Sequence, residues 1–151
     1  MTTLLLLVCA LSQTPDEIAS MREYVLARQK KGASVAKDDG VPWLQAEDLV
    51  AGQAGRLLYP RLVVRQVLGE REMLVRCDKT DLVLSGVNTK DVADGDELSK
   101  EITRQHFWVS GIRKLTTVTG ATRTLREIKP LDWEKLGIKT KPAAKPKKRG
   151  R

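Results

Sequence analysis

The pattern of hydrophobic and polar residues that constrains the fold most lies in the stretch from Phe107 to Leu131, FWVSGIRKLTTVTGATRTLREIKPL. The stretch is rich in β-branched and aromatic residues, and Gly120 with its small polar neighbours separates two runs of strand length. Alternate residues fall on opposite faces until the pattern breaks near Gly111, where a bulge or sharp bend would restore it. The sequence therefore predicts a β-hairpin with a bulge at Gly111, and barrels need such bends to close.

Three earlier runs also have the composition of strands. Arg56–Leu68 predicts a long first strand, interrupted by Pro60, which removes a ladder hydrogen bond and indicates an edge or a bulge. Turn residues then separate this run from Met73–Cys77 and Asp81–Val87, which gives five predicted strands with the hairpin. Six apolar residues of these strands are expected to point into one core: Met73, Val75, Leu82, Leu84, Phe107 and Val109.

The remaining periodic segments predict helices. Thr14–Glu17 combine an N-cap threonine, a first-turn proline and a glutamate three residues after the cap. A helix is expected from Pro15 to Lys31, and its narrow apolar stripe predicts that it docks on the outside of the domain, with partner binding as the alternative. Shorter helices are expected within Ala46–Ala51 and Ser99–Arg104. Four apolar residues near the end of the hairpin are expected to cover one end of the barrel: Leu131, Trp133, Leu136 and Ile138.

The order of elements is strand, strand, strand, a polar segment with a short helix, strand, strand. Over Gly55–Leu131 this order resembles an oligonucleotide/oligosaccharide-binding (OB) barrel. With the short helix ending in glycine before the first strand, the chain is similar to small exported bacterial OB-fold-like proteins of unknown function. The predicted fold class is mainly β with an N-terminal α-helix and a small five-stranded OB-like barrel, and an SH3-like barrel would give almost the same pattern. Residues 13–54 would hold the first helix, a linker and the short helix, and residues 55–138 the barrel.

The N-terminal segment contains an apolar run of eight residues, Leu4–Leu11. Eight apolar residues are too few to span a bilayer, but they match the hydrophobic region of a secretory signal, and a small-x-small pattern would place cleavage before Gln13. We therefore predict a signal peptide at residues 1–12 and an exported protein. The alternative is an apolar helix or strand of a cytoplasmic protein. Cleavage would leave Cys77 without an intrachain disulfide partner, and we interpret Cys77 as a small buried hydrophobic residue.

The net charge of +8 is concentrated at the C-terminal end of the chain. Residues 1–138 hold 20 basic and 19 acidic residues, so that part is close to neutral. Residues 139–151 contain two prolines and no hydrophobic residue larger than alanine, which predicts a disordered basic tail. The tail is either a solubilising extension or a contact for an anionic partner, made by Lys139, Lys141, Lys145, Lys147, Lys148, Arg149 and Arg151.

The sequence predicts no catalytic residue and no cofactor. A hydrolytic triad or a metal centre requires several convergent side chains, and the chain has one histidine, His106, which is expected to be structural or exposed. A dyad of Cys77 and His106 is the one enzymatic alternative. No glycine-rich string of the kind that cradles a nucleotide phosphate is present in the sequence.

A group of carboxylates around Gly95 invites comparison with a calcium-binding loop. If Gly95 takes the sixth position of the twelve-residue loop, Lys90 and Val92 fall where oxygen ligands are required, so the match fails. The favoured interpretation is a solvated acidic turn without a metal, with a nonstandard ion site as the alternative. The carboxylates are Asp91, Asp94, Asp96, Glu97 and Glu101.

Binding of nucleic acid is the main alternative function for a barrel of this kind. Such proteins place aromatic side chains on the second and third strands, where Met73–Cys77 and Asp81–Val87 have none. Basic residues on strands commonly keep a sheet soluble, and we favour that interpretation here. The basic residues that could line a face are Arg61, Arg65, Arg76, Arg113, Lys114, Arg123 and Arg126.

These observations together predict a non-enzymatic, exported β-barrel module that binds or organises a component of the bacterial cell envelope. Its expected partner is an anionic envelope polymer, a membrane surface or another protein. An intracellular nucleic-acid-binding barrel is the second interpretation, and an enzyme based on Cys77 and His106 is the third. The protein would be cytoplasmic if residues 1–12 are not a signal peptide.

Overall fold

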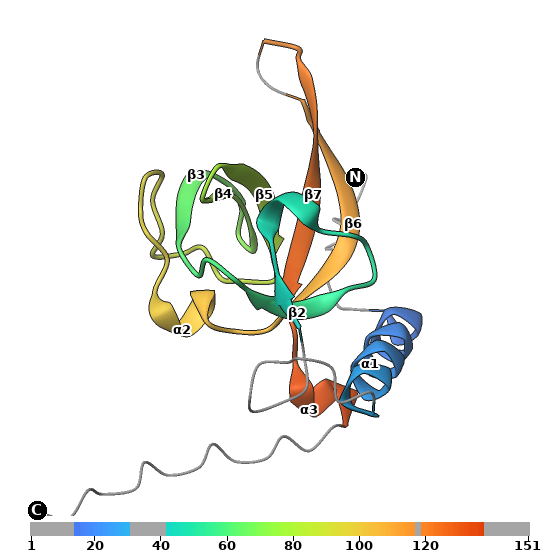
Figure 1. Ribbon diagram of the computed structural model, residues 1–151. Helices are drawn as coiled ribbons and strands as arrows, with labels where there is room; N and C mark the ends of the chain where they lie inside the picture. The colour runs from blue at the N-terminus through green and yellow to red at the C-terminus, as the bar shows by residue number, and fades with distance from the viewer. Residues whose placement is uncertain (1–13, 31–41, 117–118, 138–151) are drawn as a thin grey trace, which may run out of the picture.

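The computed structural model describes residues 14–30, 42–116 and 119–137, and this part of the chain is mainly β (Figure 1). Two short helices and a 3₁₀ turn accompany the N-terminal helix: α1 (Pro15–Lys30), η1 (Ala46–Asp48), α2 (Lys100–Thr103) and α3 (Trp133–Leu136). The strands in this part are β1 (Trp43–Leu44), β2 (Ala54–Leu57), β3 (Leu62–Gly69), β4 (Glu72–Cys77), β5 (Thr80–Ser85), β6 (Phe107–Thr116) and β7 (Thr122–Pro130).

The seven strands of the described residues form one mixed sheet in the order β1-β2-β6-β7-β5-β4-β3. The pairs β1–β2 and β5–β7 are parallel, and the other neighbours are antiparallel. β1 and β3 are the two edges, so the sheet is open in its hydrogen bonding. A mainly β fold with an N-terminal helix is therefore confirmed, but a closed five-stranded barrel is not.

The predicted first strand, Arg56–Leu68, is divided between two strands of the structure. β2 pairs with β6, whereas β3 pairs with β4 near the other edge of the sheet. The four residues between β2 and β3 include Pro60, whose ring fixes φ and whose nitrogen cannot donate to a ladder. Because so short a connection joins distant positions in the strand order, the sheet is strongly curled (Figure 1).

The hairpin expected around Gly120 is formed by β6 and β7, and it extends beyond the rest of the sheet (Figure 1). The register between these strands shifts between Val109 and Gly111, where Gly111 has a φ of 150°. The bulge that the sequence predicted at Gly111 is therefore confirmed. The bulge turns the outer part of the hairpin away from the curled sheet, because an extra residue bends and twists its strand.

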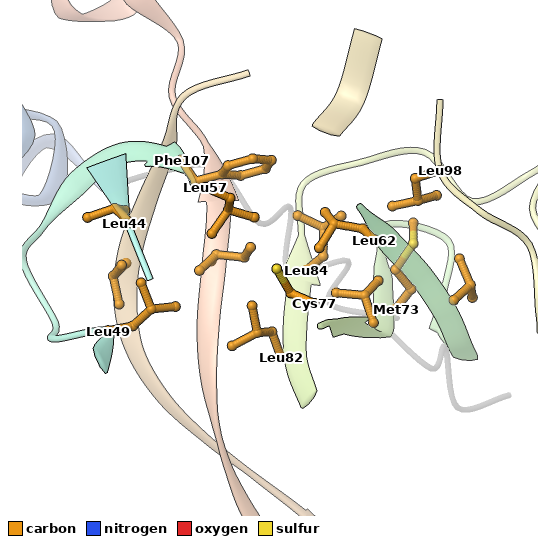
Figure 2. Packing of buried hydrophobic residues seen from close by; sticks show 14 residues of the cluster. Leu44, Leu49, Leu57, Leu62, Met73, Cys77, Leu82, Leu84, Leu98 and Phe107 are labelled. Atoms are coloured by element: carbon orange, nitrogen blue, oxygen red, sulfur yellow. The ribbon is translucent and has the colours of Figure 1, made fainter. Parts of the chain in front are cut away.

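The main core lies inside the curl of the sheet. Phe107, Val109 and the four other apolar residues expected there are all completely buried. Figure 2 shows Met73, Leu82 and Leu84 of β4 and β5 gathered in this cluster. Cys77 belongs to the same cluster and is only 2% exposed, which confirms its interpretation as a small core residue.

A second apolar cluster lies between α1 and the opposite face of β6. Met21 and Val25 of α1 are completely buried in it, and Trp108 of β6 contributes the large side chain on the sheet. Leu131 and Leu136 extend the cluster around α3, so they pack with α1 and Trp108 and not over one end of the main core, where the sequence placed them. The helix therefore docks on the outside of the sheet. Lys31 and Ile138, which the sequence also placed in these elements, lie outside the described residues.

Candidate functional site

The cationic groove is a depression of about 400 Å³ on the side of β3 and β4 that faces away from the core. Leu62 and Val64 of β3 point into the core, so the residues between and beside them face outward. The groove thus combines three cations with an aromatic ring on one surface. Its lining residues are Tyr59, Arg61, Val63, Arg65, Arg76 and Asp78.

Tyr59 lines the groove from the bend between β2 and β3. The backbone N–H of Arg61 donates to the Tyr59 carbonyl at 2.9 Å, which closes a three-residue turn around Pro60. The Cys77 thiol donates to the same carbonyl oxygen at 3.2 Å. Because these bonds hold the backbone and the residue is 62% exposed, Tyr59 presents its ring to solvent from a fixed point of the backbone.

Arg76 is held in the groove by a buried carboxylate. Its guanidinium donates from Nε to Asp81 Oδ1 at 2.8 Å and from Nη2 to Oδ2 at 3.2 Å, while Arg123 Nη2 donates to Oδ2 at 2.8 Å. Hydrogen bonding from Arg76 lowers the pKa of Asp81 below its ordinary value; burial opposes this, and Arg123 adds to the lowering. Two guanidinium groups share one carboxylate, so the Arg76–Asp81–Arg123 cluster keeps a surplus positive charge at neutral pH.

The other two arginines of the groove are more exposed. Arg61 Nε lies 3.1 Å from Glu97 Oε2, in an ion pair whose side chains are 74% and 55% exposed. An exposed pair of this kind contributes little to stability and can be exchanged for another anion. Arg65, also exposed, has no ion pair with any residue that the structure describes. Both guanidinium groups are therefore accessible to an anionic ligand.

A second charged cluster lies on β4, β6 and β7, and its one cation, Arg113, is already paired with carboxylates of the protein. Arg113 contacts Glu72 and, at 3.4 Å, Glu127, whose Oε1 also accepts a hydrogen bond from Ser85 Oγ at 2.5 Å. Burial favours a lower pKa for Arg113, but the charges of Glu127 and Glu72 outweigh it and raise that pKa. Arg113 is therefore held by two carboxylates and acts mainly within the fold.

Of the seven basic strand residues named from the sequence, the groove brings together Arg61, Arg65 and Arg76. Lys114 and Arg126 are exposed on the hairpin, outside the groove. Sequence reasoning missed Tyr59 as a site residue. Its position beside a proline that interrupts a strand, with an arginine directly after, is the signal that could have indicated it.

The acidic segment before α2 covers the free edge of β3. Asp94 Oδ1 accepts a hydrogen bond from the Val67 N–H at 2.9 Å, and backbone bonds link Val64 to Gly95 and Asp96 at 2.7 Å. Such a cover protects an edge strand from pairing with another chain. Among residues 14–30, 42–116 and 119–137, no group of three or more His, Cys, Asp or Glu side chains is arranged to hold a metal ion.

His106 and Cys77 occupy structural environments. His106 is 7% exposed; its Nε2 accepts a hydrogen bond from Arg56 Nε at 3.1 Å, and its ring meets Trp133 edge-on at 5.0 Å. Burial, and then the charge of Asp78, raises the pKa of the Cys77 thiol to about 11. At neutral pH this thiol is protonated, which makes it a poor nucleophile.

The predicted signal peptide at residues 1–12 and the basic tail at residues 139–151 lie outside the described residues. No helix in the described part of the chain is both long and apolar enough to cross a membrane. Comparison with protein-family models found no matching family, and comparisons with curated proteins and with solved structures found no significant match.

Proposed function

We propose that this protein is a non-enzymatic binding module of the bacterial cell envelope, which holds an anionic partner through the cationic groove and the basic tail. The observation that carries the proposal is the convergence of Arg61, Arg65 and Arg76 beside the exposed ring of Tyr59. Guanidinium groups pair with carboxylate and phosphate groups in fork geometry, so three of them on one surface favour an anion.

We further propose that the curled sheet is an OB-like barrel. If β2 and β3 count as two halves of one bent strand, the curl has five strands, and α2 precedes the fourth. The OB fold is a partly open five-stranded barrel, and it binds its ligands on the face of its second and third strands. Those strands would be β4 and β5, which carry Arg76 and Asp81.

Export and tethering complete the proposal. The apolar run Leu4–Leu11 supports cleavage after Ser12 and delivery to the envelope. Each of the seven cations from Lys139 to Arg151 is worth about 1 kcal/mol near an anionic membrane surface, before screening by salt. The tail would then hold the domain reversibly at such a surface, while the groove selects the partner.

The proposal is tested by producing the full chain in a bacterial host, fractionating the cells and determining the N-terminal residue. Gln13 in the envelope or medium fraction is the expected result. Purified protein from that fraction should bind an anionic polymer immobilised on beads, and binding should decrease as salt is raised. An intact Met1 in the cytosol would contradict export, and failure to bind any anionic polymer at low salt would contradict the binding function.

A second candidate function is an intracellular protein that binds single-stranded nucleic acid. The exposed ring of Tyr59 beside arginines favours it, because such proteins combine a positively charged groove with aromatic rings on which bases stack. If about four to seven phosphates are neutralised, the log-log dependence of affinity on salt should have a slope of roughly −3 to −6. A slope near zero would exclude this mode of binding.

A further inference from the structure

We infer that the cationic groove binds an acidic polysaccharide, with a sugar ring against Tyr59 and the sugar carboxylates on the groove arginines. This inference rests on the proposed function and names the ligand class for its site. The groove offers three kinds of contact at once: an aromatic face, guanidinium groups and a carboxylate. An acidic sugar chain carries a matching group for each of these contacts.

The first contact is the Tyr59 ring. Its backbone is fixed by the bonds from Arg61 and Cys77, so little conformational freedom is lost when a ligand packs on the exposed face. A planar base, or the C–H face of a sugar ring, can bury apolar area on a tyrosine while the phenol keeps its contact with water. Tyr59 alone therefore indicates a ring-shaped ligand without distinguishing the two.

The second contact is with the guanidinium groups. Arg76 is already oriented by Asp81, and the surplus charge that it shares with Arg123 remains available to a neighbouring anion. Arg61 has only an exposed ion pair with Glu97, which a ligand carboxylate can replace. The groove thus recognises anionic groups from more than one side, and planar carboxylates fit the fork of arginine.

The third contact distinguishes a sugar chain from nucleic acid. Asp78 lines the groove and Glu97 lies beside Arg61, so two carboxylates stand among three arginines. Carboxylates accept hydrogen bonds from hydroxyl groups, which a sugar chain carries on every ring and an oligodeoxynucleotide carries only at its ends. The groove also has a single aromatic ring in its lining, whereas binders of single strands stack successive bases on several.

The experiment measures binding of the full chain by affinity electrophoresis in gels that contain polygalacturonate, dextran or oligodeoxythymidylate. Polygalacturonate carries carboxylates, dextran is neutral, and the oligonucleotide carries phosphates with flat bases. We expect retardation by polygalacturonate, none by dextran, and weaker retardation by the oligonucleotide. Tyr59→Ala should weaken binding to polygalacturonate about tenfold, as expected for loss of one stacked ring. Arg65→Gln should weaken it by about fivefold or more, through loss of a charged hydrogen bond.

Two variants serve as matched controls. Trp43→Ala removes another exposed aromatic side chain, 48% accessible, which does not line the groove. Arg22→Gln removes an exposed arginine on α1, an element that lies away from β3 and β4 (Figure 1). Both should retain the affinity of the unmodified chain. All four substituted side chains are exposed, so the thermal midpoints should stay close to that of the parent.

The possible outcomes separate this inference from the proposed function. If polygalacturonate binds but Tyr59→Ala and Arg65→Gln change nothing, while removal of residues 139–151 abolishes binding, the groove is not the site and the inference is wrong, whereas anion binding through the basic tail stands. If the oligonucleotide binds more tightly than polygalacturonate, the ligand class is wrong. If the chain binds no anionic polymer at low salt, both the inference and the proposed function are wrong.

Discussion

Phe107 is the residue that fixes the core most directly. It is completely buried where β6 enters the curl of the sheet, and it is the chain's one phenylalanine. Phe107→Ala should lower the free energy of unfolding by about 3 to 5 kcal/mol, because apolar burial is lost and a cavity remains. Denaturant titration measures this change.

Ile112→Ala on the same strand is the control. Ile112 is 56% exposed, so the denaturant midpoint of this variant should hardly move. An unmoved midpoint for Phe107→Ala would show that the strand register is wrong.

Asp81 predicts a specific dependence of stability on pH. Because Arg76 and Arg123 hold its folded-state pKa below the ordinary carboxyl value, Asp81 stabilises the fold at and above neutral pH. This contribution is lost as the pH falls below about 4 and through the folded-state pKa. Asp81→Asn should therefore destabilise the protein by about 1 to 3 kcal/mol at pH 7.

The difference between the parent and Asp81→Asn should narrow as the pH is lowered from 5 towards 2 in parallel denaturant titrations. Asp91→Asn, which alters an exposed carboxylate, provides the comparison and should show no such convergence. A constant difference between the parent and Asp81→Asn across that range would mean that the Arg76–Asp81–Arg123 cluster does not act through the charge of Asp81.

The buried residues of β4 and the exposed Tyr59 illustrate what the sequence could and could not predict at this scale. Met73, Val75 and Cys77 are alternate residues of β4, so their side chains point to the same face of the strand, and all three are buried. This alternation can be recognised without knowing how the strand pairs. Tyr59 could not be found in this way. Its position depends on a turn closed by Arg61 and by the thiol of Cys77, which is distant in sequence.

At the scale of single elements, the hairpin was the most predictable part and the first strand the least. Both strands of the hairpin and the bulge at Gly111 follow from alternation and from one glycine. The run Arg56–Leu68 reads as one strand because its residues have strand propensity throughout. Pro60 indicated an interruption, but only the pairing partners of β2 and β3 show that its two halves belong to different parts of the sheet.

The backbone conformation at the Gly111 bulge can be tested by a substitution that adds one methyl group to this residue. With a φ of 150°, Gly111 has a backbone conformation that other residues rarely adopt, although space around it is open. Gly111→Ala should destabilise the protein by about 1 to 3 kcal/mol through backbone strain alone. Gly69→Ala is the matched control, since that glycine also has open space but no positive φ, and its midpoint should be unchanged or slightly raised. Equal midpoints for the two variants would contradict the bulge geometry.

At the scale of the whole molecule, sequence order predicts which elements exist better than how they close. The order of strands and of the short helix followed from the chain, whereas closure depends on which edges find hydrogen-bond partners. The acidic segment illustrates this difference. Its sequence indicated a solvated turn, and nothing in it indicated that Gly95 and Asp96 would pair with Val64 and cover the edge of β3. Edge pairing is a contact between distant residues and leaves no local periodicity.

The basic tail separates the stability of the molecule from its attachment. Residues 139–151 contain no apolar side chain larger than alanine, so they have little to bury against the domain. Deletion of residues 139–151 should leave the denaturant midpoint nearly unchanged. Sedimentation with vesicles that contain anionic lipid should nevertheless decrease strongly, because seven cations are removed.

Raising the salt concentration should weaken vesicle binding by the full chain as the Debye length shortens, and should have much less effect on the shortened chain. Binding of polygalacturonate should persist in the shortened chain if the groove holds the polymer, because Arg61, Arg65 and Arg76 are retained. A large loss of folding stability on deletion of residues 139–151 would instead mean that the tail packs against the domain. Vesicle binding that is unchanged by the deletion would mean that the domain, and not the tail, binds the membrane surface.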